Sequence, residues 1–207
     1  MGGAGFVGLG ALLGLLGAEV AMAVEEAKYT VVATEGNRQV RDYDACLVAE
    51  VVVEAGAEEA GNQAFGPLFR YISGENSARG KIAMTAPVGQ EAREKIAMTA
   101  PVGQERTPEG YAVSFMIPAS YTLETLPVPT DPAVRLRQVP ARRVAAIRYS
   151  GTWSESGYQR HREELERWMA IRGLVPAGEA VWARYDPPFM PWFLRRNEVL
   201  IPLASTP

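Results

Sequence analysis

The feature of this sequence that most constrains its fold is an order of elements that occurs twice. Strand-like runs are rich in β-branched residues or alternate in polarity, and helical stretches place apolar residues three or four apart. The first half predicts strands at 29–34, 39–43, 46–53 and 111–117 and a helix at 57–71. The second half predicts strands at 133–139, 143–150, 181–185 and 197–203 and a helix at 155–171.

Around its helix, each half therefore approximates the order strand-strand-helix-strand-strand, over about 28–117 and 133–204. Strands and helices mixed in this way predict an α+β fold with a duplicated architecture. We expect a distorted β-barrel or sheet flanked by two helices. Such an arrangement favours an apolar pocket between the halves.

An exact internal repeat lies within the first half. The phrase KIAMTAPVGQE occupies residues 81–91 and recurs at 95–105. Each copy offers a short strand, at 82–85 and at 96–99, that ends before a proline, which cannot donate to a strand ladder. The polar link between the copies is typical of a turn, so the repeat predicts a hairpin.

The first 23 residues resemble a secretory leader rather than part of the fold. An apolar run at 6–16 is followed by Ala21-Met22-Ala23, small residues of the kind found at a cleavage site. No Lys or Arg precedes the run, so an uncleaved anchor or a misassigned start stays open. We expect the protein to be exported and to reside in the periplasm, or in the cytoplasm if the leader is an artefact. We expect membrane contact only if the leader is not cleaved.

Composition excludes several classes of function. The net charge of −3 and the absence of a basic run give no footprint for nucleic acid. One cysteine, Cys46, and one histidine, His161, exclude an internal disulfide, a multi-cysteine zinc site and a histidine-rich metal site. No phosphate loop or nucleophile elbow is present. The oligomeric state is left open.

Three further motifs carry a family resemblance. KIAMTAPV begins at Lys81 and again at Lys95, TLETLP spans 122–127, and YDPP with RRNEV spans 185–199. In these motifs and in the order of elements, residues 24–207 resemble the SOUL family of haem-binding proteins. The resemblance implies a twisted, barrel-like α+β fold, similar in layout to effector-binding domains of bacterial regulators. It also implies binding of haem or a related tetrapyrrole in an apolar groove between the halves.

The resemblance gives a set of candidate binding residues. The vertebrate SOUL protein is thought to use a histidine of its first half as an iron ligand, but this chain has none there. His161 is therefore the candidate metal ligand, and methionine sulfur is a soft second ligand. Arg70 is a candidate partner for a propionate. The candidate haem-binding residues are His161, Met84, Met98, Arg70, Met190 and Trp192, and each also has a purely structural interpretation.

A different class of function stays open beside carriage or sequestration of a tetrapyrrole. Glu198 follows the arginines of the RRNEV motif. This pattern predicts either that Glu198 belongs to a salt-bridge network or that it is a lone buried carboxylate. A desolvated carboxylate has a raised pKa and can act as a base. The alternative is thus a small hydrolase-like enzyme that acts on an apolar ligand. An enzyme is the less favoured of the two.

Overall fold

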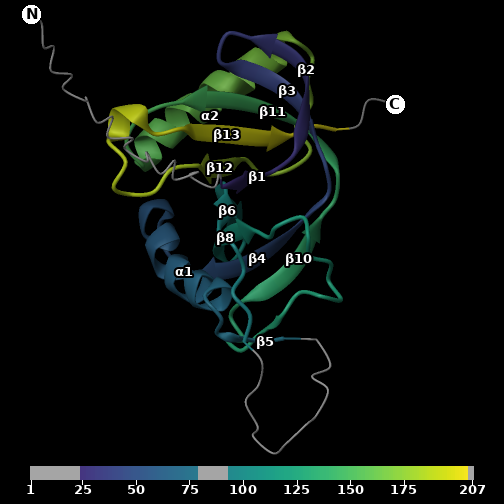
Figure 1. Cartoon of the computed structure of the whole chain (residues 1–207). Helices are drawn as coiled ribbons and strands as arrows, with labels where there is room; N and C mark the ends of the chain where they lie inside the picture. Colours follow the sequence, from purple (N-terminus) through teal and green to yellow (C-terminus); the bar gives the residue numbers. More distant parts are fainter. Residues whose placement is uncertain (1–23, 79–92, 205–207) are drawn as a thin grey trace, which may run out of the picture.

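Side-chain alternation along the strands builds one curled, antiparallel sheet of nine strands with two helices (Figure 1). The computed structural model describes residues 24–78 and 93–204. The expected α+β fold, a half-barrel sheet with two flanking helices, is confirmed. In spatial order the strands are β10 (Arg135–Val139), β4 (Cys46–Val53), β8 (Gly110–Met116), β7 (Val102–Thr107), β12 (Val181–Arg184), β13 (Asn197–Pro202), β11 (Arg142–Tyr149), β3 (Arg38–Tyr43) and β2 (Tyr29–Glu35).

The two halves of the sequence exchange strands within this sheet. β10 comes from the second half but pairs with β4 of the first. The β2–β3 hairpin comes from the first half but pairs through β3 with β11 of the second. Two short pairs lie outside the large sheet, β1 (Glu25–Glu26) with β6 (Thr99–Ala100) and β5 (Asn76–Ser77) with β9 (Val128–Pro129).

Both helices cover the same face of the sheet. α1 (Ala57–Ile72) packs on β4 and β8, and α2 (Glu155–Ile171) packs on β11 and β13. Gln104 and Trp182 are register partners on adjacent strands, so their side chains point to the same face. Gln104 donates to a carbonyl of α1, and Trp182 stacks on Tyr158 of α2. Neither α1 nor α2 covers the opposite face of the sheet, which we call the helix-free face.

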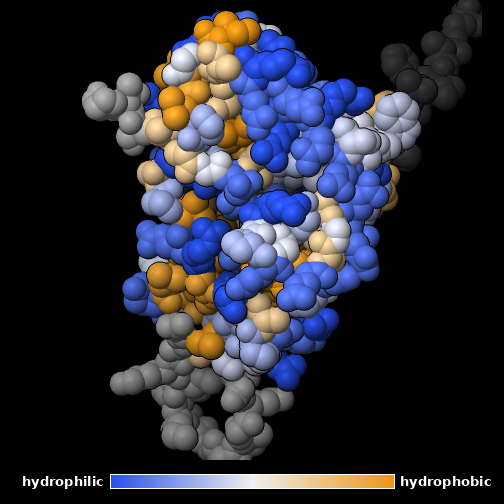
Figure 2. All heavy atoms as spheres, turned by 180° about the vertical axis from the view of Figure 1, so that it is seen from behind, coloured by the Kyte–Doolittle hydropathy of each residue, from blue (hydrophilic) through white to orange (hydrophobic). Residues whose placement is uncertain are grey.

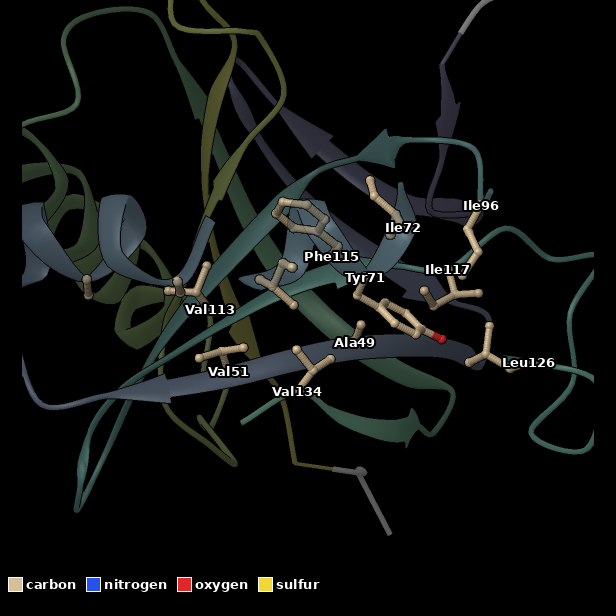
Figure 3. Packing of buried hydrophobic residues seen from close by; sticks show 13 residues of the cluster. Ala49, Val51, Tyr71, Ile72, Ile96, Val113, Phe115, Ile117, Leu126 and Val134 are labelled. Carbon is tan, nitrogen blue, oxygen red and sulfur yellow. The ribbon is translucent and has the colours of Figure 1, made fainter. Parts of the chain in front are cut away.

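The core beneath α1 includes part of the proline-rich crossover at 118–132. Figure 3 shows the Tyr71 ring among strand residues, with its hydroxyl directed toward the crossover at Leu126. This hydroxyl donates to the Pro127 carbonyl at 2.8 Å, and Leu126 is fully buried. The crossover is therefore held by both an apolar contact and a satisfied buried hydroxyl.

α2 forms where the sequence predicts it, over 155–171. Ser154 is its N-cap, and its hydroxyl accepts from the Gly157 amide at 3.2 Å. A serine in this position satisfies one of the amides that a helix start leaves free. No helix among the described residues is long and apolar enough to cross a membrane.

The strand predicted at 96–99 is wrong in position. The chain has no regular element at 93–98, and pairing in the large sheet begins only at Val102, in β7. Ile96 instead packs into the core beside α1, and its amide donates to the Ile72 carbonyl at 2.8 Å. The first copy of the repeat, with Met84, and the leader at 1–23 lie outside the described residues.

The turn between β7 and β8 requires glycine at residue 110. Gly110 has φ +133°, and a β-carbon there would overlap the Val53 carbonyl. We expect Gly110→Ala to lower the unfolding free energy by more than about 1 kcal/mol, because a strained backbone and a backbone overlap add. Gly36→Ala is the matched control, since Gly36 also has positive φ but no neighbouring atom within 4 Å. Equal urea midpoints for the two variants would contradict the assignment.

Candidate functional site

A buried ion-pair network marks the helix-free face of the sheet near the start of β13. Glu198 has no exposed surface, and its carboxylate accepts from Arg41 at 2.6 and 3.1 Å. Arg196 donates to the same carboxylate at 3.0 and 3.1 Å, and the Tyr185 hydroxyl donates at 3.0 Å. The salt-bridge interpretation of the RRNEV motif is confirmed. Glu198 is paired with two arginines, so its interpretation as a lone carboxylate is wrong.

The charges of this network are fixed by burial and pairing. Burial lowers the pKa of Arg41, but hydrogen bonding and attraction to Glu198 outweigh it, and the net shift is upward. Burial, with the nearby Glu198 charge, raises the pKa of Tyr185. The guanidinium is therefore charged and the phenol neutral over the physiological range.

A cavity of about 720 Å³ opens beside the network. We call it the arginine cavity, because four arginines and a single acidic residue line it. Its lining is Tyr29, Gly36, Asn37, Gln39, Arg41, Arg148, Tyr149, Ser150, Phe193, Leu194, Arg195, Arg196 and Glu198. The cavity combines an excess of positive charge with aromatic and aliphatic side chains.

Two arginines of the cavity are not neutralised by carboxylates. Arg148 lies across from Glu198 in the register of β11 and β13, so the two side chains share a face. In the described parts of the chain, the exposed Arg148 side chain makes no ion pair. Arg195 donates to the carbonyls of Met190 and Pro188, at 2.8 and 2.6 Å, and these partners are neutral. An anion would find free guanidinium charge here.

One wall of the cavity comes from residues 186–196, which we call the aromatic loop. It contains the short 3-10 helix η1 (Trp192–Leu194). Asp186 accepts from the Arg196 amide at 2.5 Å, which closes the base of the loop. Trp192 is 58% exposed and lines a smaller neighbouring cavity of about 290 Å³ together with Tyr149 and Arg160. The loop thus brings Trp192 next to the arginine cavity.

Met190 also lies on the aromatic loop, whereas His161, Arg70 and Met98 lie elsewhere. The His161 ring packs on Tyr149 with centroids 4.0 Å apart, between α2 and the sheet, and burial lowers its pKa. Arg70 pairs with Glu75 and Asp131 at 3.3 and 3.4 Å on the surface of α1. Met98 is 41% exposed on the irregular segment before β6. Of these last three, only His161 approaches the cavity, from behind Tyr149.

The helix-free face also holds a second cavity between the halves, lined by β4, β8, β12 and β13 among others. Its volume is about 90 Å³, well below the 300–1,000 Å³ of ordinary ligand pockets. Glu105 lies in it, and burial raises the pKa of this carboxyl. Burial also raises the pKa of the Cys46 thiol, as expected of a small buried hydrophobe rather than a reactive thiol.

Sequence reasoning missed the arginines that make the site. Arg41 and Arg148 lie more than a hundred residues apart and meet only because β3 pairs with β11. The pair Arg195-Arg196 was visible in the RRNEV motif, but not its place beside a cavity. Prolines 187, 188 and 191 were the signal for the loop, since they stiffen a stretch rich in large apolar residues.

Comparisons with known proteins agree with one another. The model of the family described as SOUL heme-binding protein matches residues 24–202. "Heme-binding protein 1" of Mus musculus is 25% identical over 194 residues, covering 91% of this chain and 97% of the relative.

Solved structures show the same fold at low identity. The EcmrR C-terminal domain is 10% identical with a TM-score of 0.53, over 86% of this chain and 99% of that one. An uncharacterized conserved protein from Listeria innocua is 13% identical with a TM-score of 0.57, over 83% of this chain and 94% of that one. These two likenesses concern the fold alone.

Proposed function

The chain belongs to the SOUL heme-binding protein family, and from this premise we propose that it binds haem or a related tetrapyrrole in the arginine cavity. The observation that carries the proposal is the pairing of uncompensated guanidinium charge with an apolar wall in one cavity. The cavity lies where the two halves of the sequence meet, with β3 from the first and β11 and β13 from the second. The function is carriage or sequestration rather than catalysis.

The chemistry of the lining fits this ligand class. Haem is a flat apolar ring with two carboxylates on one edge. Phe193 and Leu194 offer apolar surface for the ring, and Arg148 and Arg195 offer charge-assisted hydrogen bonds to the carboxylates. Arg41 and Arg196 are already held by Glu198 and keep the cavity in shape. The volume of about 720 Å³ lies within the range of small-molecule and cofactor pockets.

A haem titration followed at the Soret band tests the proposal. We expect saturable one-to-one binding, and Arg148→Ala should weaken it by roughly tenfold, the effect of losing one charge-assisted hydrogen bond. Arg167→Ala is the matched control, because Arg167 is an exposed arginine on α2, 67% exposed, away from the cavity. A folded protein that gives no saturable shift would overturn the proposal.

The same titration tests the predicted iron ligand. His161 is the single imidazole of the chain, and its ring is shielded by Tyr149 in this structure. A Soret maximum that moves in His161→Ala would make His161 the axial ligand and require Tyr149 to swing away on binding. An unchanged maximum would assign the affinity to ring contact and carboxylate pairing alone.

A further inference from the structure

We propose that the aromatic loop docks the protein on an anionic lipid surface. The loop carries four large apolar side chains that face solvent within the described structure: Phe189, Trp192, Phe193 and Leu194, which are 84%, 58%, 58% and 62% exposed. Figure 1 shows the loop at the edge of the molecule, next to the start of β13. A cluster of this kind on one short protrusion is unusual for a surface in contact with water alone.

The loop is stiff, so these side chains do not fold back onto the protein. Three prolines restrict its backbone. Arg195 holds two of its carbonyls, and Asp186 closes its base through the Arg196 amide. Trp192 and Phe193 meet edge to face, with centroids 5.6 Å apart, which fixes their rings relative to one another. A loop that already holds its bound conformation loses little conformational entropy when it inserts into a lipid surface.

The charge around the loop selects an anionic surface. Arg148 lines the cavity beside Phe193, and Arg160 lines the cavity beside Trp192. Both are exposed, and neither has a carboxylate partner among the residues described. Glu26 forms an ion pair with Arg196, while the Asp186 carboxylate accepts from the Arg196 backbone amide and keeps its charge, so the arginines at the loop outnumber its acidic groups. The loop therefore presents unneutralised positive charge although the whole chain has a net charge of −3.

Exposed apolar side chains with arginines beside them match a lipid interface, which has an apolar layer beneath a layer of charged headgroups. Aromatic side chains favour the headgroup boundary, and basic residues near an anionic leaflet add attraction that salt screens. A protein partner of ordinary size would call for a broad, complementary patch. Figure 2 shows the face turned away in Figure 1, where hydrophilic residues dominate and hydrophobic ones form separate patches. The protrusion thus favours a lipid surface over a second protein.

The described chain begins close to the loop, at Val24. Val24 lies two residues before Glu26, whose carboxylate pairs with Arg196 at the end of the loop at 2.8 Å. An apolar leader that is retained would thus be attached on the same side of the molecule as the loop. Lipid docking by the loop does not depend on tetrapyrrole binding, although it would bring the mouth of the arginine cavity to the bilayer.

The test is co-sedimentation of the full chain with vesicles, either of phosphatidylcholine alone or mixed with phosphatidylglycerol. We expect binding to the mixed vesicles that weakens as salt is added. Phe189→Ser should reduce this binding by roughly tenfold, because one aromatic side chain would no longer be buried in the lipid. Ile171→Ser is the matched control, because Ile171 is 86% exposed at the far end of α2 and Phe189 is 84% exposed. A second pair of variants tests the role of charge. Arg160→Glu should weaken binding to the mixed vesicles more than its control, Arg167→Glu.

Three results would overturn the proposal. One is no sedimentation with the mixed vesicles, and another is equal binding by Phe189→Ser and Ile171→Ser. The third is complete loss of binding when the chain begins at Val24 while its circular dichroism stays native, since the leader would then be the whole anchor. Phe189 lines none of the cavities described, so haem affinity should be the same in Phe189→Ser. Failure of lipid docking is thereby distinguishable from failure of haem binding.

Discussion

Glu198→Ala is expected to lower the unfolding free energy by about 3–5 kcal/mol, the range found when one partner of a buried ion pair is removed. The Glu198 carboxylate is fully buried and pairs with both Arg41 and Arg196. Without it, the buried Arg41 guanidinium loses its carboxylate, Arg196 keeps only Glu26, and the Tyr185 hydroxyl loses its acceptor. Urea unfolding followed by tryptophan fluorescence measures the loss.

A surface ion pair provides the control for this experiment. Asp42 pairs with Arg143 at 2.7 and 2.8 Å with similar geometry, but both side chains are 46% exposed. Solvent screens such pairs, so Asp42→Ala should have a much smaller effect than Glu198→Ala. Equal urea midpoints for the two variants would contradict the anchoring role of Glu198.

The conservative variant Glu198→Gln separates this account from the enzyme alternative. An enzyme that used Glu198 as a base would lose turnover in Glu198→Gln while its fold stayed intact. In the ion-pair network, the same change removes the negative charge that both arginines require. We therefore expect Glu198→Gln to be destabilised as well, and a variant with wild-type stability would reopen the enzyme alternative.

Local patterns predicted those parts of the fold that local interactions determine. The helix at 155–171 has an apolar stripe and a serine cap, and both features act within a few residues. The segment at 96–99 has strand-like residues, yet Ile96 is held by the end of α1 rather than by a neighbouring strand. Tertiary packing overrides β-propensity there, as it often does.

The arrangement of the sheet was beyond what periodicity can specify. Nothing in 39–43 indicates that β3 pairs with β11 instead of staying with its own half. Because Arg41 and Arg148 meet through this exchange, the arginine cavity was invisible in the sequence. The loop at 186–193 was predictable, since its prolines and aromatic residues are contiguous, and Trp192 does lie next to the cavity.

The second large effect is expected when the ligand, rather than the protein, is altered. The dimethyl ester of haem keeps the ring and the iron but lacks both negative charges. If Arg148 and Arg195 recognise the carboxylates, the ester should bind at least about tenfold more weakly than the free acid, since hydrogen bonds to charged groups contribute more than neutral ones. The apolar wall, with Phe193 and Leu194, contributes equally to both ligands.

Two protein variants connect this difference to the cavity. Arg148→Ala removes one of the two cavity guanidiniums that have no carboxylate partner, so the preference for the free acid over the ester should shrink. In Arg167→Ala, which alters an exposed arginine of α2, the preference should be unchanged. The comparison cancels differences in ligand solubility, because each ratio is taken between the same two compounds.

The most direct measurement of the central claim is therefore the ratio of acid to ester affinity in the wild type and in Arg148→Ala. Tetrapyrrole recognition by the arginine cavity predicts a ratio of about ten or more in the wild type that falls markedly in the variant. Equal affinities for acid and ester, or a ratio that Arg148→Ala leaves unchanged, would show that the carboxylates are not held there and would contradict the account.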